Sequence, residues 1–470
     1  MPQSNINSEL TSLLVAQQQA FYQQPLPSAA QRIAWLTDLR KALLEEQTSL
    51  AAAISADFTH RSVDETRLAE LLPCIEAIDY ACKRIKRWMQ PSRRSVSLAF
   101  QPASAKVVYQ PLGVVGVLVP WNYPLFLSLG PLIGALAAGN RVMIKMSEST
   151  PQTAQFIKQL LAKIYPENLV ALVQGDAEVA IAFSNLPFDH LLFTGSTQVG
   201  RLVMQAAAQN LTPVTLELRG KYPFLISEQA CLKTAAERIA FGKTMNAGQT
   251  CVAPDYLLVP EAKLEEMVSA LTQAVKSFYP SMTNNPDCTA IINPRQMTRL
   301  QAYLKDAVSL GAKAIALHDK NTIAEQHLPL TRLLKTTDEM QVMQEEIFGP
   351  ILPLVTYQSF DEALTYIRSR PKPLALYYFG TNQTEQQQVL QTLHAGGVCL
   401  NDTLLHVAQQ DLPFGGVGAS GMGHYHGYEG FLTFSHAKAV FSKSRFNATK
   451  FVYPPYGGWL QKLILKLFLR

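Results

Sequence analysis

The sequence contains few cysteines, and none of them is arranged in a pattern that binds metal or builds a disulfide framework. Six cysteines are spread over 470 residues, and no C-x-x-C pair occurs. Small secreted scaffolds are dense in cysteine, and zinc sites use closely spaced Cys or His residues. The H-E-x-x-H pattern of metalloproteases is also missing. We therefore expect no disulfide framework and no metal site.

The sequence also lacks a large excess of charge of one sign. It has 41 Lys and Arg against 36 Asp and Glu, a formal net charge of +5. Nucleic-acid-binding domains carry a dense basic patch or stripe, so we expect no nucleic-acid partner. Because 48% of the residues are hydrophobic and only 16% are charged, a disordered chain is excluded.

No run of apolar residues is long enough to cross a bilayer, which takes about 20 residues. The most apolar stretch, 112–138, is interrupted by Pro120, Asn122, Pro124 and Pro131, and we interpret it as a buried strand, a loop and a buried helix. The first ten residues lack both the basic start and the apolar core of a secretory signal, which predicts a cytoplasmic protein.

From residue 112 onward, short apolar runs alternate with stretches of helical periodicity. The runs predict strands at 114–119, 141–145, 170–173, 190–193 and 214–218, with helices at 150–164 and 198–209. Strands that are apolar on both faces are typical of a parallel sheet covered by helices on both sides. The alternation restarts after Cys251, with a strand at 256–259 and helices at 264–278 and 297–310. Further elements of the same alternation follow at 351–356, 360–368, 374–379 and 384–392. We therefore predict an α/β fold: a doubly wound parallel sheet and a second α/β unit.

The N-terminal part predicts helices followed by a strand or hairpin. Helical spacing covers 8–56 and continues over 68–88, where Pro91 ends the pattern. Polar and apolar residues alternate between 95 and 109, as they do in a strand or hairpin.

Cys251 is the first candidate for chemistry. It ends the run NAGQTC at 246–251, in which Gly248 allows close approach of the backbone. If Cys251 opens a helix, the positive end of the helix dipole would stabilise its thiolate. The alternative is a buried structural cysteine, the most common fate of this residue type.

Glu217 is the second candidate, because it lies inside the apolar strand predicted at 214–218. Burial of a carboxylate is costly and raises its pKa toward the range of a general base. The alternatives are an exposed edge position or an ion pair with a cation such as Lys221.

Two strand ends have the features of a nucleotide site. The run FTGSTQVG at 193–200 places a glycine-containing turn between a strand and a helix N-terminus, which can hold phosphate. The run MIKMSE at 143–148 ends a strand with Lys145 and Glu148, either as ribose ligands or as a solvated strand end. The G-x-G-x-x-G at 416–421 lacks a preceding strand and a following long helix, so we interpret it as a loop.

Taken together, seven motifs resemble those of the aldehyde dehydrogenase family. They are PWNYP at 120–124, IKMSE at 144–148, FTGST at 193–197, LEL at 216–218, GQTC at 248–251, EEIFGP at 345–350 and LPFGGVG at 412–418. They stand in family order, and the resemblance covers about 100–440. The runs at 248–256, 401–402 and 420–427 resemble the class 3 branch, which includes fatty and aromatic aldehyde enzymes and bacterial coniferyl aldehyde dehydrogenases.

The resemblance implies how the chain is divided. Residues 1–90 and 107–217 would form a dinucleotide-binding domain and 218–400 a catalytic domain. Residues 91–106 and 401–450 would form a small β oligomerisation extension and bridging segments, and 451–470 an amphipathic tail.

The resemblance also implies the chemistry. The Cys251 thiolate attacks the aldehyde carbon, and the Asn122 side chain with the Cys251 backbone N–H stabilises the oxyanion. Hydride passes to NAD, and Glu217 activates the water that hydrolyses the resulting thioester to the acid.

Nine residues are implied as cofactor ligands. Lys145 and Glu148 would hold the adenosine ribose, Gly195 and Ser196 would lie at the pyrophosphate, and Glu346 with Phe348 would position the nicotinamide ribose. The others are Trp121, Gly200 and Leu218. Glu148 favours NAD, because its charge repels a 2′-phosphate, but use of NADP stays open.

Arg219 departs from the family, which has two glycines where this sequence has Arg219 and Gly220. Arg219 could obstruct the cofactor, pair with Glu217 and lower its basicity, or point away. One alternative function is therefore a catalytically weakened, NAD-binding relative. A second alternative is a cysteine hydrolase or esterase, which would need a histidine base that no motif near Cys251 supplies.

The aromatic residues Trp121, Tyr123 and Phe126 predict an apolar substrate tunnel. This favours medium-chain aliphatic or aromatic aldehydes, coniferyl-type aldehydes among them, over small polar aldehydes.

The tail at 459–470 places Lys462, Lys466 and Arg470 on one helical face, surrounded by Trp, Leu, Ile and Phe. This pattern is typical of a helix that lies on a membrane surface, and it is too short to span a bilayer. The alternative is a tail that packs against a partner subunit. The class 3 resemblance implies a homodimer.

Overall fold

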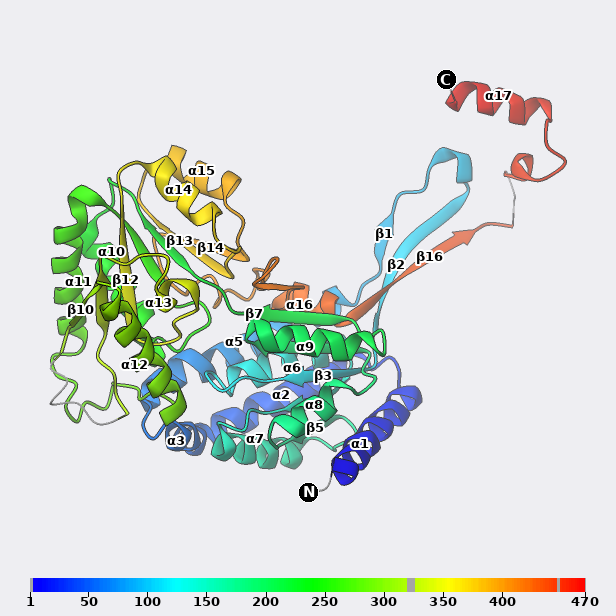
Figure 1. Cartoon of the computed structure of the whole chain (residues 1–470). Helices are drawn as coiled ribbons and strands as arrows, with labels where there is room; N and C mark the ends of the chain where they lie inside the picture. The colour runs from blue at the N-terminus through cyan, green and yellow to red at the C-terminus, as the bar shows by residue number, and fades with distance from the viewer. Residues whose placement is uncertain (1–2, 319–325, 446–448, 470) are drawn as a thin grey trace.

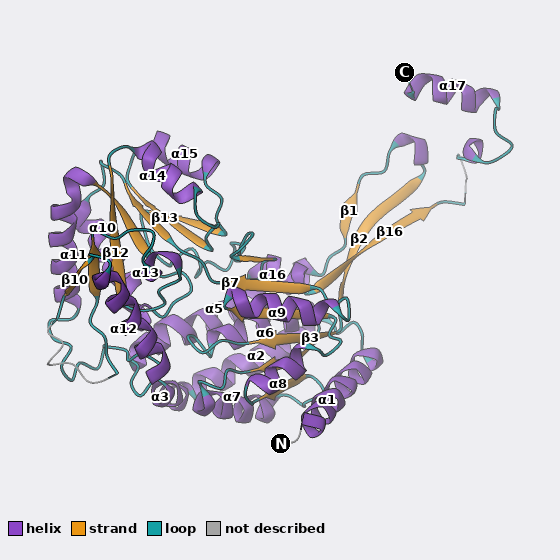
Figure 2. Cartoon of the chain, viewed as in Figure 1, coloured by secondary structure: helices purple, strands orange, loops and turns teal. Residues whose placement is uncertain are grey.

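The computed structural model describes residues 3–318, 326–445 and 449–469. Two α/β units lie side by side, and a β extension projects from them and ends in the C-terminal helix (Figure 1). Figure 2 shows the strands of both units lying among covering helices. The predicted α/β class, with a second α/β unit and a small β extension, is confirmed.

The first unit is built on a six-stranded sheet with strand order β15-β7-β6-β3-β4-β5. Its strands are β3 (Val114–Leu118), β4 (Arg141–Lys145), β5 (Val170–Val173), β6 (His190–Gly195), β7 (Val214–Leu218) and β15 (Gly421–Met422). The pairs among β3 to β7 are parallel, and β15 is antiparallel to β7. Every residue of β3, β4 and β5 is buried, as expected for a sheet covered on both faces.

Helices cover the two faces of this sheet. On one face lie α2 (Ala29–Glu45), α5 (Leu72–Trp88), α6 (Phe126–Ala138) and α7 (Pro151–Ile164), with α3 (Gln47–Asp57) against α7. On the other lie α1 (Gln3–Gln23), α8 (Ala177–Ser184) and α9 (Thr197–Ala208). The strand β15 and the helix α16 (Gly427–Thr433) also belong to this unit, because β15 pairs with β7 and α16 packs against α6. This part of the range 401–450 therefore lies in the first unit instead of a bridging segment. A two-residue strand has no periodicity by which a sequence could reveal it.

The second unit contains a seven-stranded sheet with strand order β10-β11-β12-β9-β8-β13-β14. Its strands are β8 (Pro223–Ile226), β9 (Tyr256–Pro260), β10 (Lys313–Ala316), β11 (Thr331–Leu334), β12 (Ile351–Tyr357), β13 (Ala375–Phe379) and β14 (Gly397–Leu400). Its helices are α10 (Leu232–Thr244), α11 (Leu264–Phe278), α12 (Pro294–Ser309), α13 (Gln341–Gln344), α14 (Phe360–Arg368) and α15 (Gln383–Thr392). The pairs are parallel except for β10 and β11.

The extension is a three-stranded antiparallel sheet of β1 (Ser92–Arg94), β2 (Ala103–Pro111) and β16 (Ser435–Lys443). Beyond it, α17 (Trp459–Phe468) has no buried residue. No helix in the part of the chain that the structure describes is long and apolar enough to cross a membrane.

The helix predicted over 68–88 is interrupted near its start. Residues Arg67–Leu71 form a π-helix between α4 (Val63–Thr66) and α5. Pro73 explains the change, because it has no N–H to donate to an α-helical ladder. The wider turn places Glu70 in the interior, where its side chain is fully buried.

Candidate active site

The catalytic and cofactor candidates gather at one edge of the first sheet. Parallel strands end at this edge, and ligands of doubly wound folds bind beyond the carboxyl ends of strands. Asn122 follows β3, Lys145 ends β4, Ser196 follows β6 and Leu218 ends β7. Cys251 lies in the loop that leads from α10 to β9 of the second unit, so the site lies between the two units.

Cys251 follows a turn with a left-handed backbone. The φ angles are 52° at Asn246, 51° at Ala247 and 71° at Gly248. A side chain at Gly248 is excluded, because its Cβ would lie 2.6 Å from the carbonyl oxygen of Gly349. Cys251 does not open a helix: it comes after the 3-10 helix Met245–Gly248, and a turn follows it. The expectation that a helix dipole stabilises its thiolate is therefore wrong.

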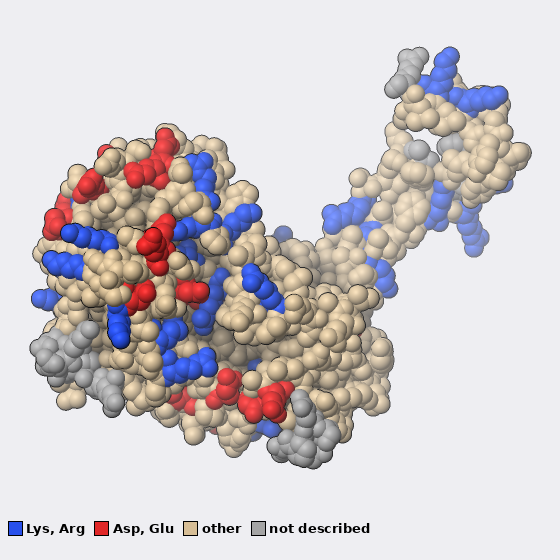
Figure 3. Space-filling view, in the orientation of Figure 1, with Lys and Arg blue, Asp and Glu red and all other residues tan. Residues whose placement is uncertain are grey.

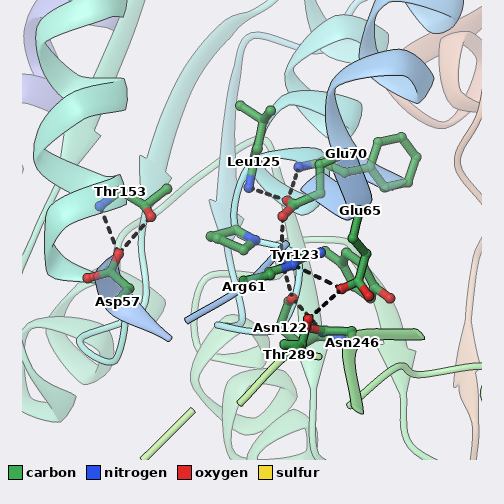
Figure 4. Close-up of polar contacts among 12 residues, drawn as sticks. Asp57, Arg61, Glu65, Glu70, Asn122, Tyr123, Leu125, Thr153, Asn246 and Thr289 are labelled. Carbon is green, nitrogen blue, oxygen red and sulfur yellow. Dashed lines mark hydrogen bonds and ion pairs between the residues drawn. The ribbon is translucent and has the colours of Figure 1, made fainter. Parts of the chain in front are cut away.

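Figure 4 shows how the loop that carries Asn122 is held in place. The Arg61 guanidinium donates to the Glu70 carboxylate (2.7 Å) and to the carbonyl oxygen of Asn122 (3.3 Å). Glu70 in turn accepts hydrogen bonds from the backbone N–H groups of Leu125 and Phe126, at the start of α6. The Arg61 and Glu70 side chains are fully buried, so neither charge is screened by solvent.

The Asn122 loop is also connected to the turn that precedes Cys251. The Asn246 side-chain amide donates to the Asn122 carbonyl oxygen (3.0 Å), and the hydroxyls of Tyr123 and Thr250 lie 2.7 Å apart. The side-chain nitrogen Nδ2 of Asn122 is buried and has no hydrogen-bond partner among the described residues. A free amide donor therefore lies in a loop that is hydrogen-bonded to the loop that carries Cys251.

Glu217 lies in β7 and is buried, which excludes the exposed edge position. Its Oε2 accepts hydrogen bonds from the hydroxyls of Tyr425 (2.9 Å) and Thr194 (3.3 Å). Burial raises the pKa of Glu217, and hydrogen bonds from Tyr425, Cys251 and Thr194 oppose that rise. The result is a carboxylate with the raised pKa that a general base requires.

The thiol of Cys251 has a raised pKa as well. Burial raises the pKa of Cys251 well above its usual range, and the negative charges of Glu217 and Glu346 raise it further. At neutral pH the thiol is therefore protonated in the structure as it stands, and its proton has to be removed before it can act as a nucleophile.

An apolar cavity of about 210 Å³ opens beside Cys251 and Glu217. Tyr123 and Phe126 line it, as the tunnel prediction requires. Trp121 does not line it. The Trp121 ring instead packs edge-on against Phe348, with 5.2 Å between ring centroids, so the tunnel prediction is wrong for this residue. The direction of its side chain depends on the second unit, which a local sequence pattern does not reveal.

Lys145 and Glu148 lie together at the end of β4. Lys145 Nζ is 3.8 Å from the Glu148 carboxylate and donates to the carbonyl oxygen of Gly175 (2.8 Å). The Lys145 side chain is buried and the Glu148 side chain is 60% exposed. The carboxylate therefore faces solvent, as a group that binds ribose hydroxyls would.

The turn after β6 leads directly into α9. Ser196 caps this helix, because its Oγ accepts the backbone N–H of Val199 (3.3 Å). Gly200 lets α9 lie close to the sheet, since a Cβ at Gly200 would be 2.4 Å from a methyl carbon of Leu218. Gly195, the last residue of β6, stands just before the helix N-terminus, where free N–H groups favour an anion.

Glu346 and Phe348 lie across the crevice, on the second unit. The Glu346 side chain is buried, and its Oε1 has no hydrogen-bond partner among the described residues. Burial raises the pKa of Glu346 to about 8, and the charge of Arg219 opposes this rise. A free carboxylate oxygen here and a helix N-terminus at α9 fit a dinucleotide, which presents ribose hydroxyls and phosphates.

Arg219 lies on the cofactor side of the site. Its Nε is 3.1 Å from Glu346 Oε2, and its guanidinium carbon is 4.6 Å from the ring centroid of Phe348. It therefore neither pairs with Glu217 nor points away from the site.

The loop that carries Glu346 and Phe348 is held by residues that the sequence did not reveal as part of the site. Lys221, weighed as a partner of Glu217, instead forms an ion pair with Asp255 (2.7 Å) and donates to the carbonyl oxygen of Glu345 (3.1 Å). Asp255 accepts the N–H of Ile347 (3.1 Å). The one signal in the sequence is that Lys221 and Asp255 each border an apolar run.

The sequence patterns also did not indicate that Arg61, Glu70 and Tyr425 belong to the site. Glu70 interrupts an otherwise apolar helical stripe, which is a signal for a buried charge, but its partner and its distance from Asn122 are set only by the fold. Tyr425 is 208 residues from Glu217 in the chain, and no local pattern connects them.

No group of three or more His, Cys, Asp or Glu side chains in the described ranges could hold a metal ion. The fold and this crevice, which joins a nucleotide-binding sheet edge to a buried cysteine and a buried carboxylate, define the class: a dinucleotide-dependent oxidoreductase.

Comparison with known proteins gives the family. The aldehyde dehydrogenase family matches residues 7–440. A probable coniferyl aldehyde dehydrogenase of Pseudomonas aeruginosa is 61% identical over 100% of this chain and 98% of its own length. A coniferyl aldehyde dehydrogenase of a Pseudomonas species is 43% identical over 97% of this chain and 95% of its own. The solved structure of Staphylococcus aureus AldH in a substrate-bound state matches with a TM-score of 0.92 at 38% identity, over 98% of this chain and 99% of that chain.

The chain belongs to the aldehyde dehydrogenase family and to its class 3-like branch. It is an NAD(P)-dependent enzyme that oxidises an aldehyde to the carboxylic acid. These matches do not favour the cysteine hydrolase or the catalytically weakened relative.

Proposed function

We propose that this enzyme oxidises aromatic or medium-chain aliphatic aldehydes, including aldehydes of the coniferyl type. The observation that carries the proposal is the cavity beside Cys251, which is lined mainly by apolar side chains, among them Tyr123, Phe126 and Phe414. Burial of apolar substrate surface is favourable by about 25 cal/mol per Å². A small charged aldehyde would lose its hydration there without gaining partners. The two Pseudomonas relatives named above support the aromatic class.

We assign the first chemical step to Cys251 and Asn122. The Cys251 sulfur forms a bond to the aldehyde carbon, and the carbonyl electron pair moves onto oxygen, which gives a thiohemiacetal. The free Nδ2 of Asn122 and the backbone N–H of Cys251 are assigned to the oxyanion. The Cys251 thiol loses its proton to solvent before this bond forms, which leaves the Glu217 carboxylate free to accept a proton in the second step.

We assign the second step to Glu217. The bound cofactor supplies the acceptor for the hydride that leaves the thiohemiacetal carbon. A thioester of Cys251 remains, and Glu217 takes a proton from a water that adds to its carbonyl carbon. The carbon–sulfur bond then breaks, the acid leaves, and Cys251 is regenerated.

We assign each of the nine cofactor residues to one part of the dinucleotide, according to where the residue lies in the crevice. Lys145 and Glu148 hold the adenosine ribose, while Gly195 and Ser196 with the N-terminus of α9 hold the pyrophosphate. Glu346 and Phe348 on the second unit, with Trp121 of the first unit packed against Phe348, hold the nicotinamide side. Gly200 and Leu218 act by letting α9 approach the sheet.

The test is reduced-cofactor absorbance with NAD and then NADP, with hexanal, benzaldehyde and coniferaldehyde against betaine aldehyde and succinic semialdehyde. We expect turnover of the first three that vanishes in Cys251→Ala. A preference for betaine aldehyde or succinic semialdehyde would rule out the proposed substrate class.

We also propose that the chain forms a homodimer through the β extension. Its three strands project from the body and leave β1 and β16 as open sheet edges, which present unpaired N–H and C=O groups (Figure 1). Light scattering should give twice the 52.0 kDa mass of the chain, and a monomer mass would refute the proposal.

We propose that the tail makes peripheral contact with anionic membrane surfaces in the cytoplasm. Residues 92–111 and 435–470 contain ten of the 41 Lys and Arg and none of the 36 Asp and Glu. Figure 3 shows only Lys and Arg among the charged side chains visible on the extension. Trp459 (77% exposed) and Phe468 (79%) are open to solvent in α17. Apolar and basic groups together favour an anionic lipid surface.

Co-sedimentation with vesicles of anionic phospholipid tests the tail. The chain should bind them in low salt, and Lys462→Glu with Lys466→Glu should abolish binding, while vesicles of zwitterionic lipid should bind weakly. Equal binding by the variant, or dissociation of the dimer in the variant, would overturn the proposal, and the second result would assign the tail to the partner subunit.

A further inference from the structure

Arg219 connects the two units across the crevice. Its backbone follows β7 of the first unit, where its carbonyl oxygen accepts a hydrogen bond from the Thr197 hydroxyl (3.3 Å) at the start of α9. Its side chain ends on the second unit, with Nε 3.1 Å from Glu346 and the guanidinium over the ring of Phe348. The side chain therefore spans from the helix N-terminus that faces the crevice to the carboxylate on the other side.

The ion pair between Arg219 and Glu346 lies in a place where charge interactions are strong. The Glu346 side chain is 5% exposed and the Arg219 side chain is 30% exposed. A partly buried pair is screened less by salt and water than a surface pair. Phe348 adds a cation–π contact to the same guanidinium. Arg219 is thus held against Glu346 and Phe348 by two contacts.

The position of this pair conflicts with a bound dinucleotide. Phosphates at the N-terminus of α9 and a reactive ring at Cys251 require the intervening ribose to pass the end of β7, where Arg219 lies. Glu346 is close enough to Cys251 for its charge to act on the thiol. A ribose hydroxyl and the Arg219 guanidinium would thus be donors that compete for one carboxylate.

We propose that Arg219 competes with the nicotinamide ribose for Glu346 and thereby weakens binding of the nicotinamide half of the cofactor while leaving the adenosine half unaffected. The inference rests on the proposed role of Glu346. The adenosine side is independent because Lys145 and Glu148 lie at the end of β4, and two strands, β3 and β6, separate β4 from β7. Arg219 is thus a specificity-determining residue: it sets how tightly the reacting half of the cofactor is held relative to the anchoring half.

The experiment compares the affinities of NAD and ADP, which lacks the nicotinamide ribose, by titration calorimetry. In Arg219→Gln, NAD should bind about tenfold more tightly, the ratio that corresponds to about 1.4 kcal/mol. The affinity of this variant for ADP should stay within about twofold of that of the unmodified chain, since the substitution does not touch the contacts of ADP. Arg295→Gln, an exposed residue in the first turn of α12, removes the same charge and should change neither affinity.

A double-mutant cycle isolates the pair. In a Glu346→Gln background, Arg219→Gln should no longer raise NAD affinity, because the competed carboxylate is gone. Arg219→Lys, which keeps the charge and loses the planar stacking, should give an intermediate NAD affinity. If Arg219→Gln instead raised NAD affinity through a general change of structure, the same increase would also appear in the Glu346→Gln background.

Two results would overturn the inference. An unchanged ratio of NAD to ADP affinity in Arg219→Gln would show that Arg219 does not compete. A weaker NAD affinity in that variant would make Arg219 a ligand of the cofactor. Failure of the proposed function is distinguishable, because a different preferred aldehyde would change the substrate ranking and leave the ratio of NAD to ADP affinity untouched.

Discussion

At the scale of single residues, the proposed chemistry depends on two buried acidic groups that influence each other. The Cys251 thiol and the Glu217 carboxylate both have raised pKa values, in each case chiefly because of burial. Local patterns in the sequence brought these two residues forward as candidates: Cys251 ends a glycine-containing run, and Glu217 lies inside an apolar strand. The hydrogen-bond partners of Glu217, which are Tyr425 and Thr194, come from other parts of the chain and decide how basic Glu217 can be.

Glu217→Gln should separate the two halves of the reaction. The amide cannot take a proton from water, so the thioester should accumulate after hydride transfer. In stopped-flow absorbance we expect a burst of about one equivalent of reduced cofactor, followed by turnover reduced by about 10²-fold or more. Steady turnover without a burst would exclude Glu217 as the hydrolytic base.

The alkylation rate of Cys251 should rise with pH through the alkaline range, because the raised pKa keeps the thiol protonated at neutral pH. Glu217→Gln removes a neighbouring negative charge, which lowers the pKa of Cys251, so alkylation at pH 7 should become faster. The measurement is the iodoacetamide rate resolved by peptide mass spectrometry. Cys231 is exposed and serves as the internal control, since its rate should not respond to the Glu217 substitution. An unchanged Cys251 profile would contradict the assigned coupling.

At the scale of elements, strands and helices with strong patterns were predicted well, and short or irregular ones were not. The predicted strands at 141–145, 170–173 and 214–218 match β4, β5 and β7, and the predicted helix at 264–278 matches α11. The strands β8 and β14 were missed, since each has four residues and begins with Pro223 or Gly397. Both are formed by pairing with strands distant in the chain, β14 with β13 and β8 with β13 and β9, which is a tertiary effect.

Glu70→Gln should impair the loop of Asn122. The substitution leaves the buried Arg61 charge without its closest partner, and the loss of one partner of a buried pair costs about 3–5 kcal/mol. We expect a lower melting temperature and a lower kcat, with little change in the KM for NAD, because the adenosine ligands lie on other strands.

Asp57→Asn is the matched control for Glu70→Gln. Asp57 accepts the N–H groups of Gln152 and Thr153 at the start of α7, just as Glu70 caps α6, but it does not contact the Asn122 loop (Figure 4). The Asp57→Asn variant should lose about 1 kcal/mol of its free energy of unfolding, and its kcat should be unchanged. Equal losses of kcat in the two variants would show that Glu70 acts only through stability.

At the scale of the whole molecule, charge and exposed apolar surface are distributed unevenly. The extension and tail carry ten basic residues and no acidic residue, so the remainder of the chain has a net charge of −5 although the whole has +5. The chain therefore consists of an acidic body and a basic, partly apolar projection, and the small net charge of the whole chain does not reveal this division.

Deletion of residues 457–470 should leave the melting temperature of the body within about 1 °C, because α17 contributes no buried residue. Differential scanning calorimetry of the full and shortened chains at one concentration checks this. A fall of several degrees would show that α17 packs on the protein in solution, either on this chain or on the partner subunit.

Motifs and periodicities that are local in the chain indicate the family, the α/β class and the candidate residues of the reaction, so the sequence alone can predict these. The packing of the folded chain decided where the charges are paired: Arg61 with Glu70, Lys221 with Asp255, and Arg219 with Glu346. It also decided that Trp121 faces Phe348 and that Cys251 follows a turn instead of opening a helix. The physical reason is that a buried charge takes whichever partner the packing of two separate units brings within reach, and that distance is not encoded in any local spacing.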